Sequence, residues 1–177
     1  MTKHNIYLIG LSGTGKSTVG KILSQIIKLP HIEMDEKITK KDGRNIDQIF
    51  AKKGEGYFRN IESEILTEIC SHKGYIVSTG GGVPIKIENR DIMLKSGFVV
   101  NLTASANDIL FRVKKDGNII RPLLGKKSSL ESIKKMMEER KKIYKFAQLT
   151  LDTSNKTPND IALNISDNWN EWKKIHG

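Results

Sequence analysis

Gly-Leu-Ser-Gly-Thr-Gly-Lys-Ser-Thr, residues 10–18, follows the apolar run Ile6-Tyr7-Leu8-Ile9 in this chain of 177 residues. The stretch fits the pattern G-x-x-x-x-G-K-[ST], with an expected strand before it and a helical pattern after it. Glycines let the main chain turn tightly, so that its N–H groups converge on phosphate oxygens. The positive end of the new helix points at the same place. This stretch, the phosphate-binding loop, predicts a site for a nucleoside triphosphate.

Two side chains of the phosphate-binding loop carry chemistry that a plain glycine-rich turn would not need. Lys16 adds a mobile positive charge, and Ser17 offers a hydroxyl to Mg²⁺. A plain turn leaves this Lys-Ser pair unexplained. We therefore expect the triphosphate to bind together with Mg²⁺.

The overall composition suits a single domain spanning residues 1–177. No apolar run approaches the roughly 20 residues of a membrane span, so we expect no membrane association. Residues 1–4 lead directly into the first expected strand, so we expect no secretory signal. The lone cysteine, Cys70, is expected to pack in the core and cannot form an internal disulfide. We therefore expect a cytoplasmic protein.

The formal net charge of +10 has two interpretations. A basic surface can bind nucleic acid, but aromatic residues are sparse and no nucleic-acid module is recognisable. Alternatively, part of the excess charge serves small anionic substrates in a cleft, and the rest is solvated lysine. Because the lysines are scattered in pairs rather than gathered in one stripe, we favour the second interpretation and expect no nucleic-acid partner.

Helical and strand patterns alternate along the whole chain, which is typical of a parallel sheet with crossover helices. Segments predicted as strands cover residues 5–9, 31–34, 75–78, 98–102 and 149–153. We therefore predict an α/β fold with a five-stranded parallel sheet and helices on both of its faces.

Three later helices have recognisable limits. Thr103 or Ser105 can cap a helix that runs to about Val113. A second helix is expected over 129–146. The last begins at the capping pattern of residues 157–160, and its two tryptophans are expected to pack in the core.

Two acidic residues stand at the end of the second expected strand, and ligands of open α/β sheets bind beyond such carboxyl ends. Alternate residues of a strand face the same way, so Glu33 and Asp35 are expected to share one side. One carboxylate can hold a water on Mg²⁺, and the other can orient or deprotonate an attacking hydroxyl. Solvated acids at a strand end are the alternative.

An arginine and a glutamate lie three apart in the helical pattern Phe58-Arg59-x-x-Glu62, so they are neighbours on the helix surface. Arg59 can grip a substrate carboxylate while Glu62 holds the guanidinium in place. A routine surface ion pair is the alternative. Further along, Thr79-Gly80-Gly81-Gly82 follows the third expected strand, and its glycines permit close approach of a ligand.

Residues 114–128 lack a sustained periodicity and predict a mobile lid. Arg121 lies inside this segment, within Arg-Pro-Leu-Leu, and Arg140 lies on the helix after it. A loop arginine most often belongs to the plain surface. Here, closure of the lid can bring Arg121 over the phosphates, where it neutralises charge on the transferring group.

Taken together, these motifs resemble the shikimate kinase family of nucleoside-monophosphate-kinase-like P-loop proteins, from residue 5 to about residue 165. The resemblance rests on the order and separation of the phosphate-binding loop, the strand-end aspartate, Gly-Glu-x-x-Phe-Arg-x-x-Glu (54–62), Thr-Gly-Gly-Gly (79–82), Arg-Pro-Leu-Leu (121–124) and Arg-x-x-x-Tyr (140–144). It implies a three-layer P-loop kinase fold with a substrate-binding region at about 33–62 and a lid at about 114–128.

The family phosphorylates the 3-hydroxyl of shikimate with MgATP, on the route to chorismate and the aromatic amino acids. The resemblance implies that the ATP phosphates are held by Gly13, Thr14, Gly15, Lys16, Ser17 and Thr18. It also implies that Ser17 binds Mg²⁺, that Arg121 is the lid arginine, and that Arg112 and Lys156 border the adenine. Lys16 and Arg121 are thereby expected to be catalytic, and a monomer is expected.

For the acceptor, the resemblance implies that Asp35 contacts the shikimate hydroxyls and is the catalytic base. Arg59 and Arg140 are expected to hold the shikimate carboxylate, beside the main chain of Gly80, Gly81 and Gly82. Glu33 is expected to contact the metal through a water, and it stands where the family usually has Asp, so the reach of this outer contact is expected to differ.

Three further departures from the family pattern are visible. Tyr57 replaces a commonly acidic residue, no proline follows Arg140, and the spacing from Arg112 to Arg121 is slightly long. The first alternative is another small-molecule kinase of this fold, such as a gluconate kinase or a nucleotide kinase. The others are a protein that binds ATP without catalysis and a basic protein that binds nucleic acid.

Overall fold

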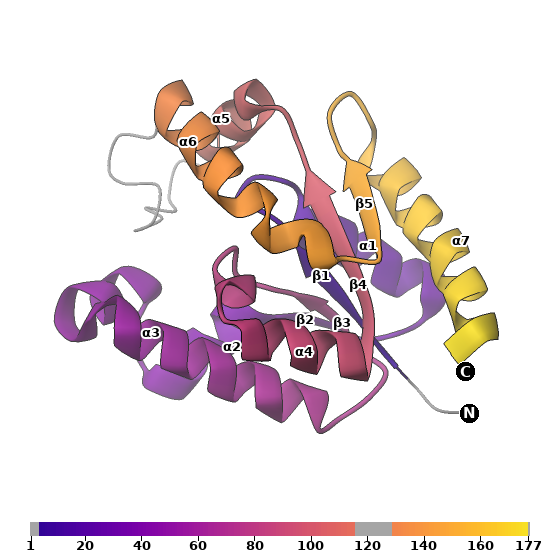
Figure 1. Cartoon of the computed structure of the whole chain (residues 1–177), viewed down its shortest axis with the longest axis horizontal. Helices are drawn as coiled ribbons and strands as arrows, with labels where there is room; N and C mark the ends of the chain where they lie inside the picture. Colours follow the sequence, from indigo (N-terminus) through magenta and orange to yellow (C-terminus); the bar gives the residue numbers. More distant parts are fainter. Residues whose placement is uncertain (1–3, 116–128, 177) are drawn as a thin grey trace.

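The computed structural model describes residues 4–115 and 129–176 (Figure 1). Its five strands form one parallel sheet in the order β2-β3-β1-β4-β5. They are β1 (Asn5–Ile9), β2 (His31–Glu33), β3 (Ile76–Ser78), β4 (Gly97–Thr103) and β5 (Leu149–Asp152). The predicted five-stranded parallel sheet is confirmed.

The helices cover both faces of the sheet. They are α1 (Lys16–Ile27), α2 (Met34–Asp42), α3 (Ile46–Cys70), α4 (Ile87–Ser96), α5 (Ala106–Lys115), α6 (Leu130–Lys141) and α7 (Pro158–His176), with short 3₁₀ turns η1 (Val83–Ile85) and η2 (Ile143–Phe146). In Figure 1, α1 and α7 lie on one face, whereas α3, α4 and α6 lie on the other. None of the described helices is long and apolar enough to cross a membrane.

The central strand β1 shows how the sequence builds two cores. All five of its residues are buried. Ile6 and Leu8 point into the cluster formed with α1 and α7, while Tyr7 and Ile9 point into the cluster formed with α3 and α4. The alternation of side chains along a strand therefore sends consecutive apolar residues to opposite layers. Cys70 packs against this second core, with its Sγ 3.0 Å from the Tyr7 hydroxyl.

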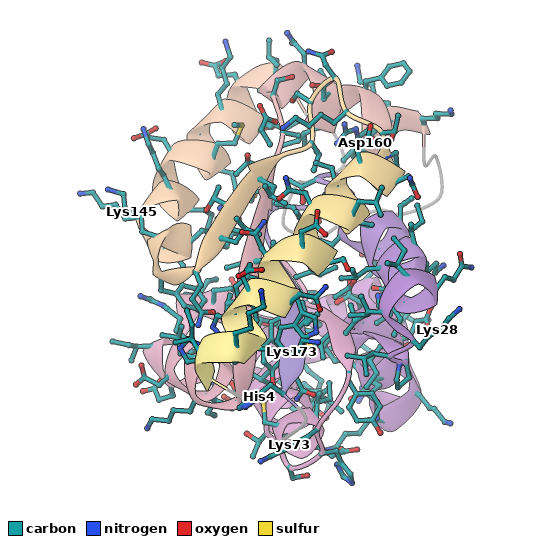
Figure 2. All side chains as sticks on the ribbon, turned by 90° about the vertical axis from the view of Figure 1, so that its right-hand side faces the viewer. His4, Lys28, Lys73, Lys145, Asp160 and Lys173 are labelled. Atoms are coloured by element: carbon teal, nitrogen blue, oxygen red, sulfur yellow. The ribbon has the colours of Figure 1, made fainter. Side chains whose placement is uncertain are left out.

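The last helix, α7, closes the face that carries α1. Its capping box is present, because Thr157 Oγ1 accepts from Asp160 N at 3.1 Å and Thr157 N donates to the Asp160 carboxylate. Trp169 is 4% exposed and packs on Phe98, as predicted. Figure 2 shows α7 across the front of the molecule, with Asp160 near its first turn and His4 beside its last.

Three predicted boundaries were wrong. The second strand ends at Glu33, so Met34 opens α2 instead of closing the strand. The helix expected over 129–146 is two pieces, α6 and the 3₁₀ turn η2. The helix expected to stop near Val113 continues to Lys115, which removes the first two residues from the predicted lid. Tight 3₁₀ turns are common where an α-helix ends, and periodicity alone does not separate them.

Candidate active site

The chain segments that follow β1, β2 and β3 meet at a polar cavity of about 210 Å³. Most of the predicted site residues line it, although they come from four separate parts of the sequence. The lining consists of Ser12, Gly13, Gly15, Lys16, Ser17, Thr18, Glu33, Asp35, Thr79, Gly80, Gly81 and Arg112. The structure thus brings the phosphate-binding loop, Asp35 and two of the predicted glycines to one place, whereas Arg59, Gly82 and Arg140 do not line this cavity.

The phosphate-binding loop is shaped by its own main chain. Gly15 is the residue before α1 and has φ 94°, a left-handed conformation in which any other residue would be strained. The Lys16 ammonium is 8% exposed and donates to the carbonyls of Gly10 and Leu11, both at 2.8 Å. Thr14 is buried, and its hydroxyl donates to Leu11 O at 2.8 Å. Lys16 therefore already lies over the loop that it is predicted to serve.

Arg112 ties α5 to the phosphate-binding loop. Its guanidinium donates to Gly13 O at 3.2 Å, and to the hydroxyl and carbonyl of Thr153 at 2.9 and 3.1 Å. The Thr153 hydroxyl lies 3.1 Å from Thr14 O. The loop after β5 is thus fastened to the same site. Lys156 lies exposed further along that loop, and its role stays a prediction.

Glu33 lies beside Ser17 at the edge of the cavity. Burial raises the pKa of the Glu33 carboxyl, and a hydrogen bond from the Ser17 hydroxyl opposes this rise. Its Oε1 is buried and, among the described residues, has no hydrogen-bond partner. That atom lies 3.5 Å from His31 Nε2, which is 2.8 Å from Ser78 Oγ. Mg²⁺ in proteins keeps several of its waters and takes few protein ligands. The unpaired Oε1 of Glu33, next to the Ser17 hydroxyl, is therefore suited to accept a hydrogen bond from a water bound to Mg²⁺.

Asp35 lies in the first turn of α2, so the argument from strand alternation was wrong. It still lines the same cavity as Glu33, because the chain turns from strand to helix at Met34. A Cβ placed on Gly80 would lie 3.2 Å from Asp35 Oδ1 and 2.8 Å from Glu62 Oε1. Residues 79–82, the glycine loop, come this close to the two acids only because position 80 has no side chain.

Arg59 is held in a buried cluster of charges on α3. It is 8% exposed, its Nη1 donates to the carboxylate of Glu62, and its Nη2 donates to Glu55 at 3.0 Å. The Glu62 side chain is 1% exposed. The alternative of a routine surface ion pair is therefore wrong. The contact with Glu55 was missed, although its spacing of four residues is the other neighbour distance on a helix.

Burial raises the pKa of Glu62 to about 7, even though Arg59 lies beside it, and the charges of Asp35 and Glu55 add to the rise. The Arg59 guanidinium also packs on Gly82, where a Cβ would overlap it. Two charged groups removed from water, Arg59 and Glu62, thus lie against the glycine loop that lines the cavity.

Tyr144 joins the glycine loop to η2, because its hydroxyl donates to Gly81 O at 2.7 Å. Burial raises the pKa of Tyr144, while the charges of Arg140 and Arg59 lower it, so both arginines act on this phenol. Arg140 is partly buried, but it does not line the polar cavity. Arg121 and the rest of the predicted lid from residue 116 to residue 128 lie outside the described residues.

Comparison with known proteins decides the family. The family model described as SKI, shikimate kinase, matches residues 12–169. The chain belongs to the shikimate kinase family. A shikimate kinase of Sulfurihydrogenibium sp. (strain YO3AOP1) is 43% identical over 161 residues, which cover 91% of this chain and 95% of that relative. The predicted family and its kinase activity are confirmed.

Solved structures agree with the family. The shikimate kinase of Acinetobacter baumannii, in complex with shikimate, has a TM-score of 0.86 and 34% identity, over 93% of this chain and 91% of that one. A gluconokinase of Sinorhizobium meliloti has a TM-score of 0.58 and 17% identity, over 99% of both chains. The second likeness shows the fold alone.

Proposed function

We propose that this chain transfers the γ-phosphoryl group of ATP to the 3-hydroxyl of shikimate, giving ADP and shikimate 3-phosphate. One observation carries the proposal: the phosphate-binding loop and Asp35 line one polar cavity, and the buried Arg59 packs on Gly82, directly after the glycines of that lining. A Cβ placed on Gly81 would lie 3.3 Å from Gly10 O, so the glycine loop and the phosphate-binding loop are in contact. ATP bound to the phosphate-binding loop and shikimate bound beside the glycine loop would therefore be neighbours, as phosphoryl transfer requires.

The nucleotide half of the proposal rests on residues 13–18. Their N–H groups and the start of α1 form a positive surface for the β- and γ-phosphates, and the Lys16 ammonium needs only to leave two carbonyls to reach them. Arg112 is held beside this loop and, with Lys156, would border the adenine. Arg121 would cover the phosphates from the lid.

Ser17 and Glu33 would hold Mg²⁺, the serine directly and the glutamate through a water. When bound with ATP, Mg²⁺ offsets the negative charge of the phosphate oxygens. The orphaned Oε1 of Glu33 supports this assignment.

The acceptor half rests on Arg59 and Asp35. Glu62 and Glu55 hold the guanidinium of Arg59 where water is largely excluded, so a further carboxylate would meet a fixed donor. Arg140 would complete the grip, and the main chain of Gly80, Gly81 and Gly82 would contact the ring. Asp35 would take the proton of the 3-hydroxyl. The hydroxyl oxygen bonds to the γ-phosphorus while the bond from that phosphorus to ADP breaks.

The proposal extends to a cytoplasmic monomer acting as one domain. ATP is a cytoplasmic metabolite, and residues of a single chain supply both halves of the cavity.

The test measures ADP release with shikimate, gluconate and CMP as parallel acceptors. We expect turnover with shikimate alone, and turnover only with another acceptor would overturn the proposal. Asp35→Asn should lower kcat by about 10² or more, because a positioned base contributes that much. Glu36→Gln, the exposed neighbour on α2, is the matched control and should leave kcat unchanged.

A further inference from the structure

A second cavity of about 400 Å³ lies on the α6 side of the sheet, near the carboxyl ends of β4 and β5. No described residue lines both this cavity and the polar one. In Figure 1, α6 passes over the face of the sheet near β4, while β5 forms the edge of the sheet. Leu149 and Leu151 of β5 pack toward α7, and Thr150 between them is exposed. The helical layer therefore leaves part of the sheet uncovered.

The floor of this cavity breaks the pattern of β4. Phe98, Val100 and Leu102 point toward α7, and Val99 points toward the α6 side. Asn101 follows Val99 on the α6 side, where alternation would place another apolar residue. It is paired in register with Thr150, and both line the cavity. The floor is thus polar, although the position favours an apolar side chain.

Asn101 is also left without a partner. It is 6% exposed, and its Oδ1 is buried with no hydrogen bond among the described residues. Buried polar groups in folded proteins are nearly always paired, because an unpaired one loses its hydrogen bonds to water without replacement. An acceptor in the wall of an open cavity therefore indicates an N–H or O–H group that arrives from outside.

The walls and the rim add two further properties. Leu11, Ile109, Met137 and the ring of Tyr144 form apolar walls, which favour a flat apolar group. Lys141 and Lys145 line the rim, and Lys141 makes only a loose exposed pair with Glu138, at 3.9 Å. Figure 2 shows Lys145 at the outer edge of the molecule. Two lysines against one glutamate favour an anion at the entrance.

We propose that this second cavity binds a small aromatic acid. Its ring lies between the apolar walls, an N–H or O–H on the ring donates to Asn101 Oδ1, and its acidic group lies between Lys141 and Lys145. This ligand is distinct from both substrates, because neither Lys16 nor Arg59 lines this cavity and no described residue lines both cavities.

The position of the second cavity makes the bound acid an effector. Leu11 and Thr14 in its wall belong to the phosphate-binding loop, and Lys16 donates to Leu11 O. Tyr144 in its wall holds Gly81 of the glycine loop through its hydroxyl. A ligand that contacts both groups acts as an effector when it binds the shikimate-loaded and the free chain with different affinity, and it and shikimate then alter each other's affinity by the same factor.

The test uses indole-3-acetate as probe, titrated calorimetrically into the full chain with shikimate and a non-hydrolysable ATP analogue at saturation. We expect binding with a Kd below about 1 mM, weaker binding of 1-methylindole-3-acetate, which lacks the donor, and weaker binding of 3-methylindole, which lacks the acid. Absence of binding, or binding that disappears when both substrates are present, overturns the proposal.

Variants locate the probe. Asn101→Leu keeps the volume and removes the orphaned acceptor, so it should fold stably and bind the probe about five- to tenfold more weakly. The double variant Lys141→Gln/Lys145→Gln should weaken binding by a similar factor, whereas Lys142→Gln, an exposed neighbour outside the cavity, should not. If Asn101→Leu, the double lysine variant and Lys142→Gln all bind the probe with equal affinity, the probe does not bind in this cavity and the proposal is overturned. If the probe binds but leaves the Kd of shikimate unchanged, the effector role is overturned.

Discussion

The two halves of the polar cavity are built in different ways. The phosphate half consists of nine consecutive residues, 10–18, whose main-chain N–H groups are proposed to bind the phosphates. Gly15 forms the turn into α1. The acceptor half consists of Asp35 and the glycine loop in the lining, and of Arg59, Glu62 and Tyr144 packed against that loop from α3 and η2. A main-chain site needs little from its surroundings, whereas a side-chain site depends on every neighbour that buries it.

The difference has an energetic side. Arg59 and Glu62 are both removed from water, and a buried ion pair offsets its desolvation only when its geometry is held. The phosphate half buries a single charge of this kind among its residues 10–18, Lys16, and its ammonium donates to main-chain carbonyls of the same loop. We therefore expect mutations in the two halves to separate ATP use from acceptor use.

The largest effect is expected in the phosphate half. Lys16→Ala should lower kcat by about 10³ or more, because it removes the ammonium that stabilises charge on the transferring group. Lys21→Ala, an exposed lysine on the same helix, is the control and should stay near wild type. Steady-state kinetics with MgATP and shikimate measure both. Retention of most activity by the first variant would refute the proposed role of Lys16.

In the acceptor half, Arg59→Ala should raise the KM of shikimate about 10- to 100-fold, the loss expected for a hydrogen bond between charged groups. The KM of ATP should change little, because the phosphate-binding loop stands on its own main chain. Arg44→Ala, an arginine paired with Asp42 outside the cavity, is the matched control. Equal losses for ATP and shikimate would mean that the two halves are not separable.

The glycine loop offers a sharper version of the same comparison. Gly82→Ala introduces a Cβ where the Arg59 guanidinium lies, so it should raise the KM of shikimate by roughly tenfold through displacement of that side chain. Gly56→Ala on α3 meets open space and should instead stabilise the fold by about 0.5–1 kcal/mol. Kinetics and thermal unfolding of the pair distinguish them. If the KM of shikimate is unchanged in Gly82→Ala, Arg59 can shift without weakening shikimate binding.

The smallest effect concerns the pH dependence of stability. The pKa of Glu62 is about 7 in the folded chain and 4.5 as the ordinary value, so the native state binds more protons between these limits. The free energy of unfolding should therefore fall as pH rises from about 4.5 to 7, and level off above.

Glu62→Gln should lack that slope, and the two proteins should diverge by about 1 kcal/mol or more across this window. Urea titrations at several pH values measure the difference. Parallel curves for the two proteins would show that Arg59 keeps Glu62 ionised throughout.

The sequence predicted the parts of the site that depend on neighbours in the chain. The phosphate-binding loop, the contact between Arg59 and Glu62 and the glycines after β3 were found because each is a local pattern. The position of Asp35 was argued wrongly, since a three-residue strand and the helix after it cannot be separated by periodicity. The contacts of Arg112 with Thr153 and of Tyr144 with Gly81 join residues 41 and 63 apart, and no local pattern reports them.

What the sequence by itself determined was the α/β fold, the phosphate-binding loop and the family, because hydrophobic periodicity and main-chain geometry are properties of short stretches. Only the tertiary structure decided how deeply Arg59 and Glu62 are buried, how Arg112 is fixed to the loop, and that Asn101 is left unpaired in the wall of a second cavity. Burial, and with it the strength of every charge and hydrogen bond, depends on which distant segments pack together.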